Sequence, residues 1–179
     1  NQILQEVKAT GDVALRRFTK QFDKADVKEF AASADEFFAA QSALDPRLKA
    51  AILSARVNIE TFHKTQLTEA APVETMPGVL CWRKNIAIEK VGLYIPGGTA
   101  PLFSTLLMLG VPAKLAGCKE IIVCTPPDEN GKIPDVILFA AKAVGITNVY
   151  RVGGVQAIAA MTYGTASIPK VSEIFGPGN

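Results

Sequence analysis

The chain has 179 residues, which is enough for one domain with a substantial buried core. Its 19 Lys and Arg residues nearly balance its 17 Asp and Glu residues, and 49% of the residues are apolar. This composition excludes an intrinsically disordered chain and gives no reason to expect binding to nucleic acid. One His and three Cys, with no CxxC spacing, leave few ligands for a zinc site built from this chain alone.

Cysteine usage and hydropathy indicate the compartment. Three unclustered cysteines do not form a disulfide framework, so we expect a soluble protein of the cytoplasm. No apolar run is long enough to cross a membrane, and the first residues lack the order of a signal peptide. The chain begins at Asn1 and ends in the Gly/Pro-rich sequence FGPGN, and we expect both ends to be cut from a longer protein.

The first part of the chain is predicted to be helical. Apolar residues recur at helical spacings from the start of the chain, with Asp12 predicted as a helix N-cap. A short second helix is expected around Phe38. The clearest start signal is Asp45-Pro46, an N-cap residue followed by proline at the first helical position.

A change in composition near residue 90 divides the chain. Charged residues are concentrated before this point, whereas all but two of the 14 glycines follow it. The stretch 79–93 is predicted to be strand-like, because apolar residues such as Ile86 and Ile88 alternate with other residues. We therefore predict a mainly helical amino-terminal segment over 1–78 and a Rossmann-like α/β domain over 79–179.

The second part alternates strand, glycine turn and helix. The segments VGLYI, EIIVC and NVYRV are predicted strands, and helices are expected over 103–116, in PDVILFAAKAVG and in GGVQAIAAMTYG. This alternation is typical of right-handed βαβ units in a mostly parallel sheet. The predicted fold class is therefore α/β, a Rossmann-like βαβ sheet preceded by an amino-terminal helical segment. Ligands of such sheets bind beyond the carboxyl ends of the strands.

Two of the predicted strand-to-helix loops contain paired glycines, Gly97-Gly98 and Gly153-Gly154. Glycine lets the backbone approach a ligand closely, and the following helix start offers N–H groups to a phosphate. Neither loop has the GxGxxG spacing of dinucleotide-binding loops. The second predicted strand ends in CTPP, where such folds have a carboxylate that binds the ribose. Asp128, a little further on, is predicted to lie in a solvated turn. A nucleotide-binding loop and a plain tight turn both remain open at this point.

The run VGLYIPGGTAPLFSTLLMLGVPAKLAGCKEIIVCTPP, followed by NVYRVGGVQAIAAMTYGT and VSEIFGPGN, resembles the histidinol dehydrogenase family. The resemblance implies a zinc-requiring oxidation of L-histidinol to L-histidine by NAD, with L-histidinaldehyde as the intermediate, in a cytoplasmic homodimer. It also implies that this chain is an amino-terminal portion, incomplete relative to the full enzyme.

The resemblance places NAD contacts on three residues, Tyr94 in LYIPGG, Gln156 in GGVQAIAA and Asn179 in FGPGN. Tyrosine and glutamine hydrogen-bond to or pack against an adenosine or a ribose, and asparagine holds hydroxyl or phosphate groups. Without the motif, Tyr94 would be interpreted as an amphipathic core residue, Gln156 as a capping partner and Asn179 as a turn residue.

The resemblance places no catalytic residue and no zinc ligand in this chain, and the zinc ligands are expected outside it. His63 is predicted to be a helix-surface or core residue, because a metal site needs several converging ligands. The cysteines Cys81, Cys118 and Cys124 are predicted to be buried small apolar residues. We expect the chain to be inactive alone. The alternatives are a non-catalytic nucleotide-binding module and an oligomerisation domain.

Overall fold

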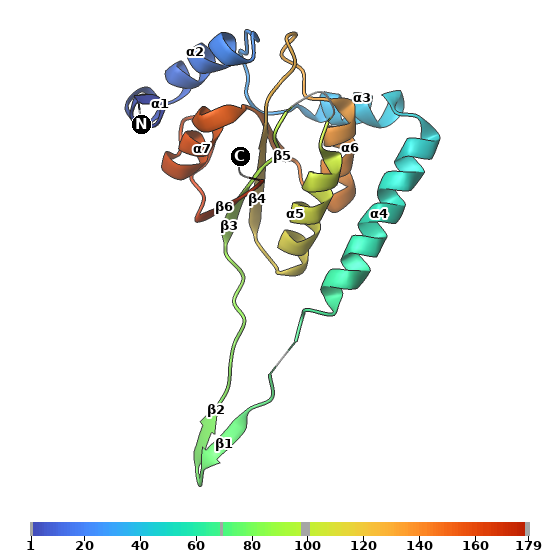
Figure 1. Cartoon of the computed structure of the whole chain (residues 1–179), viewed down its shortest axis with the longest axis vertical. Helices are drawn as coiled ribbons and strands as arrows, with labels where there is room; N and C mark the ends of the chain where they lie inside the picture. The colour runs from blue at the N-terminus through green and yellow to red at the C-terminus, as the bar shows by residue number, and fades with distance from the viewer. Residues whose placement is uncertain (1, 69, 98–100, 178–179) are drawn as a thin grey trace.

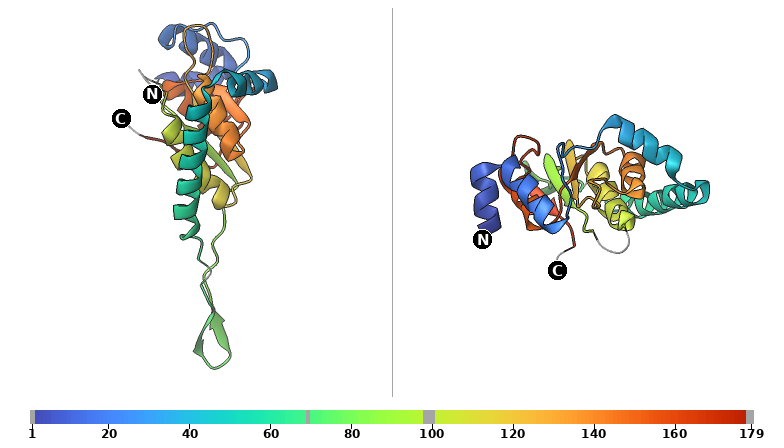
Figure 2. Two further views of the ribbon diagram at one scale, coloured as in Figure 1. Left: turned by 90° about the vertical axis from the view of Figure 1, so that its right-hand side faces the viewer. Right: turned by 90° about the horizontal axis from the view of Figure 1, so that it is seen from above.

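A computed structural model of the chain describes residues 2–68, 70–97 and 101–177 as helices on both sides of a parallel sheet (Figures 1 and 2). The elements in chain order are α1 (Gln2–Thr10), α2 (Asp12–Phe22), α3 (Ala34–Ala43), α4 (Pro46–Lys64), β1 (Val73–Met76), β2 (Val79–Cys81), β3 (Lys90–Tyr94), α5 (Phe103–Leu115), β4 (Glu120–Thr125), α6 (Asp135–Val144), β5 (Asn148–Arg151), α7 (Gly154–Tyr163) and β6 (Glu173–Phe175). Within these ranges no helix is both long and apolar enough to cross a membrane.

The main sheet has four parallel strands in the order β5-β4-β3-β6. The apolar run of β4 is continuous because both faces of this strand are covered. Ile121 and Val123 belong to the core on one face, and Ile122 and Cys124 belong to the core on the other. The predicted Rossmann-like α/β sheet is confirmed.

The amino-terminal helices complete both helical layers. On one face α5 and α6 pack with α3 and α4, and on the other face α7 packs with α1 and α2 (Figure 2). Segments 1–78 and 79–179 therefore share the same two cores. The predicted boundary between these segments falls in the turn of the β1–β2 hairpin, and the division into two domains stays a prediction.

Two predicted helix starts have different outcomes. The carboxylate Oδ1 of Asp45 accepts a hydrogen bond from the N–H of Arg47 at 2.8 Å, so the N-cap of α4 is confirmed. The N-cap prediction for Asp12 is wrong: Gly11, at φ 54°, caps α2, and Asp12 is the first helical residue. The Asp12 carboxylate instead accepts a hydrogen bond from the Ser167 hydroxyl at 2.6 Å and ties α2 to the segment after α7.

The strand predicted over 79–93 is only partly correct. Its first residues pair with β1 in an antiparallel hairpin, and its last residues form β3, but residues 82–89 lie in no strand. An alternating pattern forms a strand only where a neighbouring strand satisfies its backbone groups, and Ile86 is 79% exposed instead of paired. The hairpin consequently projects away from the sheet at the amino end of β3 (Figure 1).

A loop after α2 covers the outer edge of β5. Ala31 forms an antiparallel bridge with Tyr150, and the N–H of Arg151 donates to the carbonyl of Phe30 at 2.9 Å. The Arg151 guanidinium also binds Glu36 of α3, with Nη2 2.5 Å from Oε2. Coverage of an edge strand in this way prevents the edge from pairing with another chain.

Replacing Glu36 with Gln is expected to destabilise the protein by about 1–2 kcal/mol at pH 7, because the charged partner of Arg151 is lost while an N3 capping acceptor remains. Burial alone would raise the pKa of Glu36, but the Ser33 N–H and the Arg151 guanidinium bring this pKa below its ordinary value of 4.5. The contribution of the ion pair is therefore present above pH 4.5 and is lost as the pH falls through the lowered pKa.

Urea denaturation at neutral and acidic pH measures this difference. The unfolding free energies of the wild type and the Glu36→Gln variant should converge in acid, while the exposed Glu29→Gln variant serves as the control. A difference that stays constant from neutral to acidic pH would show that the pair does not act through the ionised carboxylate.

Candidate functional site

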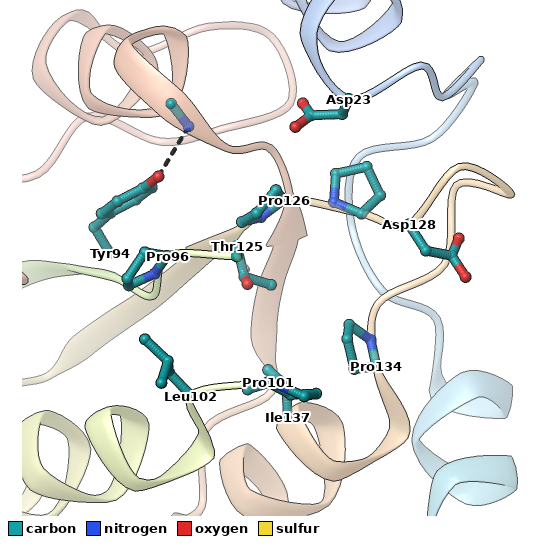
Figure 3. A pocket seen from close by; sticks show the side chains of 13 residues that line it. Asp23, Tyr94, Pro96, Pro101, Leu102, Thr125, Pro126, Asp128, Pro134 and Ile137 are labelled. Atoms are coloured by element: carbon teal, nitrogen blue, oxygen red, sulfur yellow. Dashed lines mark hydrogen bonds between the residues drawn. The ribbon is translucent and has the colours of Figure 1, made fainter. Parts of the chain in front are cut away.

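Two cavities lie at the carboxyl ends of the parallel strands. The first, of about 420 Å³, opens between the loops that follow β3 and β4, and its lining includes Asp23, Tyr94, Pro96, Thr125, Pro126, Asp128 and Gly154 (Figure 3). The second, of about 470 Å³, lies between the ends of β3 and β6, and its lining includes Tyr94, Pro96, Gly154, Val155, Ile158 and Ile174. Tyr94, Pro96 and Gly154 line both cavities.

The strand order explains why these cavities lie where they do. Counted from β3 as the first strand, the order β5-β4-β3-β6 is 3-2-1-4. The chain progresses outward through β4 and β5, then crosses the sheet through α7 and places β6 on the other side of β3. Ligands of doubly wound sheets bind at the carboxyl ends of the strands where the strand order reverses, and the second cavity lies at that point.

Tyr94 lies between the two cavities. It ends β3, is partly buried, and its hydroxyl accepts a hydrogen bond from the N–H of Gly154 at 3.0 Å (Figure 3). This bond joins the end of β3 to the first turn of α7. The side chain that the motif predicts as a cofactor contact therefore lies at the carboxyl edge of the sheet, at the amino end of a helix.

Gln156 lies in the same turn of α7 and is only 1% exposed. Its Oε1 is 2.8 Å from the position that a Cβ on Gly154 would occupy, so the amide packs against the glycine that lines both cavities. In the part of the chain that the structure describes, this Oε1 has no hydrogen-bond partner. Tyr94 and Gln156 thus meet at Gly154, whereas Asn179 lies outside the described residues.

The glycines of the two loops pack on one proline. A Cβ on Gly153 would lie 2.5 Å from Cβ of Pro126, and a Cβ on Gly97 would collide with the same ring. Gly154 differs, because its φ of +62° is a conformation that favours glycine. Gly97 and Gly153 therefore fit the tight-turn interpretation, since their small size lets three loops meet; Gly98 lies outside the described residues.

Two carboxylates line the first cavity. The Asp128 Oδ1 accepts hydrogen bonds from the N–H groups of Asn130 and Lys132 at 2.9 and 2.8 Å, and so holds the turn that was predicted there. Asp23, at the end of α2, was not singled out by the sequence. No local signal could have found it, because it precedes β3 by many residues and reaches the cavity only through the packing of α2 beside α7.

The metal-ligating residue types are dispersed over the described ranges, where no three His, Cys, Asp or Glu side chains gather. His63 lies in the last turn of α4, with its Nδ1 2.7 Å from Oε1 of Gln66, which confirms the helix-surface prediction. Cys124 is buried, and burial raises the pKa of its thiol to about 12. Cys118 is half-buried, but burial is wrong for Cys81, because the projecting hairpin leaves it exposed.

Comparison with known proteins gives consistent matches over the whole chain. The family profile described as histidinol dehydrogenase matches residues 1–179. The chain is 58% identical over 177 residues to the histidinol dehydrogenase of Bacteroides fragilis, covering 99% of this chain and 41% of the relative. It is 52% identical to that of Shigella dysenteriae, covering 100% of this chain and 40% of the relative. The crystal structure of histidinol dehydrogenase from Elizabethkingia anophelis matches with a TM-score of 0.97 and 51% identity, covering 99% of this chain and 41% of that chain.

Proposed function

The chain belongs to the histidinol dehydrogenase family, and from this membership we propose that it supplies NAD-binding surface for the oxidation of L-histidinol to L-histidine. The chain spans about 41% of the length of the curated relatives that it matches. The activity of the whole protein is therefore part of the proposal. The observation that carries it is the pair of cavities at the carboxyl ends of the parallel strands, which share Tyr94 as a lining residue and of which the second lies at the reversal point of the sheet.

The volumes of the two adjoining cavities are compatible with a ligand that consists of two linked halves. Each has a volume within the range of about 300–1,000 Å³ that is typical of small-molecule sites. NAD consists of two nucleotides joined by a pyrophosphate, and when bound it accepts the hydride that leaves the alcohol carbon. We propose that one nucleotide lies over the ends of β3 and β4 and that the other lies toward β6.

Tyr94 and the first turn of α7 are the groups proposed to position the cofactor. The Tyr94 hydroxyl accepts from the Gly154 N–H and still has its own hydrogen to donate to a ribose or phosphate oxygen. The amino end of α7 adds backbone N–H groups and the positive end of the helix dipole, which favours an anion. Gln156 and Asn179 remain proposed NAD contacts, Gln156 through its position against Gly154.

Zinc is proposed to bind outside the described residues. Those residues do not fit a zinc site, because no three candidate ligands converge among them. Removal of the hydroxyl proton of the substrate needs a base, and we propose that this base lies outside the chain together with the zinc ligands, as the resemblance implies. We therefore assign to this chain the binding and orientation of NAD and no step of proton transfer.

We also propose a cytoplasmic homodimer. The three cysteines are free thiols, as is usual in a reducing compartment. The β1–β2 hairpin carries exposed apolar side chains, among them Val73, Met76, Leu80 and Trp82. Apolar side chains that are exposed on a projecting segment are candidates for burial on association, and this supports the homodimer proposal.

The proposed function is tested with the protein as its gene encodes it. Two hydrides leave L-histidinol on the way to L-histidine, so each histidinol consumed should reduce two NAD molecules, and a molecule of water supplies the second carboxylate oxygen. The absorbance of NADH during complete conversion of a known amount of histidinol measures this ratio. A protein that binds NAD but shows no histidinol-dependent reduction would instead be a non-catalytic nucleotide-binding module.

Replacing Tyr94 with Phe is expected to weaken NAD binding about five- to tenfold, because a hydroxyl that bonds both the Gly154 N–H and the ligand is lost. Calorimetric titration with NAD measures the dissociation constant, and the zinc content should stay unchanged. The Tyr163→Phe variant, at the far end of α7, is the matched control. Equal affinities for NAD in both variants would remove Tyr94 from the proposed site.

A further inference from the structure

The turn after α2 brings a carboxylate to the end of β4. Asp23 caps the carboxyl end of α2, where its N–H donates to the carbonyl of Thr19 at 2.9 Å, and its side chain lines the first cavity. In Figure 3 this carboxylate lies at the top of the view of the cavity, above both Pro126 and Asp128. The side chain therefore enters the cavity from outside the sheet.

Nothing that the structure describes pairs with this carboxylate. Its Oδ2 is buried and has no hydrogen-bond partner among the described residues, and burial raises the pKa of Asp23. A buried acceptor without a donor lowers stability, so such a group in a native protein requires an explanation. Asp128 gives the contrast, because its carboxylate is used by the N–H groups of its own turn. The Asp23 carboxylate, by contrast, accepts no hydrogen bond from the described residues at its buried Oδ2.

The position of Asp23 near the end of β4 suggests a role for its carboxylate. In doubly wound dinucleotide sheets, a carboxylate at the end of the second strand accepts hydrogen bonds from the ribose of the cofactor. Here β4 is the second strand, and it ends in Thr125 followed by two prolines, which have no acidic side chain. Asp23 lines the same cavity as Thr125 and Pro126, although it comes from a different part of the chain.

We propose that Asp23 accepts hydrogen bonds from the vicinal hydroxyls of a ribose, that of the nucleotide bound over β3 and β4. The inference rests on the proposed function, since it assumes a dinucleotide in these cavities. Two carboxylate oxygens match two neighbouring hydroxyl donors. The negative charge of Asp23 also repels a phosphate on the 2′-oxygen, so this residue makes the site select NAD over NADP.

The experiment compares Asp23→Asn with Asp26→Asn in the whole gene product. Asp26 lies three residues away, its side chain is 82% exposed, and it does not line either cavity, so it is a matched control. NAD and NADP are titrated separately by calorimetry, and the melting temperature is measured without cofactor. We expect Asp23→Asn to weaken NAD binding about tenfold, to reduce the preference for NAD over NADP, and to leave the melting temperature unchanged or higher.

The stability measurement separates a binding role from a structural one. Loss of affinity together with a lower melting temperature would overturn the inference, because Asp23 would then act by holding the fold. Unchanged NAD affinity in Asp23→Asn, with normal binding by the wild type, would overturn the inference alone. A wild type that binds neither NAD nor NADP would overturn the proposed function as well, so the two failures are distinguishable.

Discussion

Replacing Phe30 with Ala is expected to destabilise the protein by about 3–5 kcal/mol, the usual cost of removing a buried aromatic ring. Phe30 is fully buried in the core formed by α1, α2 and α7, and the Arg16 guanidinium lies 5.5 Å from its ring centroid. The buried ring also holds in place the loop that covers β5, since the ring shares a core with Tyr150 and Val152 while the backbone carbonyl of Phe30 accepts from the Arg151 N–H. Urea denaturation, with the wild type in parallel, measures the loss.

Phe38→Ala is the matched control for this prediction. Phe38 lies on α3 and is 72% exposed, so its removal should change the unfolding free energy by less than about 0.5 kcal/mol. Similar losses in the two variants would show that the edge-covering loop is not held by the Phe30 ring. A larger loss for Phe38→Ala would indicate that α3 packs on a further surface that includes this ring.

Phe30 also shows where sequence patterns stop being informative. It lies between α2 and α3, in a stretch with no helical or strand period, and its burial depends on contacts with β5, which follows more than 100 residues later. By contrast, EIIVC and the glycine-bounded helices were predictable, because their periods and breaks are local. The order β5-β4-β3-β6 confirms the fold class, although no local pattern specifies that β6 lies beside β3.

The sequence predicted the location of the candidate site, because ligands of such sheets bind at the carboxyl ends of the strands and the strands were predictable. Tyr94 and Gln156 were predicted only through the resemblance of their motifs to histidinol dehydrogenase, and the structure brings both to Gly154. Asp23 was not found, since the missing carboxylate of β4 was sought only within the second part of the chain. A residue such as Asp23, which reaches the cavity from a distant part of the chain, is placed there by tertiary packing and not by local spacing.

Replacing Gly153 with Ala tests whether the paired glycines are needed for loop packing. The φ of Gly153 is −108°, which alanine adopts without strain, so any effect is steric. The new Cβ would lie 2.5 Å from Cβ of Pro126 and 3.1 Å from its Cα, and the backbone atom cannot move aside cheaply. We expect a loss of about 1–3 kcal/mol in unfolding free energy, as for other overpacked sites, together with weaker NAD binding.

A double-mutant cycle with Pro126→Gly distinguishes this clash from a general intolerance of alanine in the turn. Pro126→Gly removes the ring and the Cβ that the new methyl group would meet, so the cost of Gly153→Ala should fall by at least half in that background. If the cost of Gly153→Ala were the same with and without Pro126, contact between the β4 and β5 loops would not explain why glycine is needed. If it falls, the glycine pair after β5 acts by letting that loop lie against the loop after β4, which fixes the wall that Tyr94, Gly154 and Asp23 share.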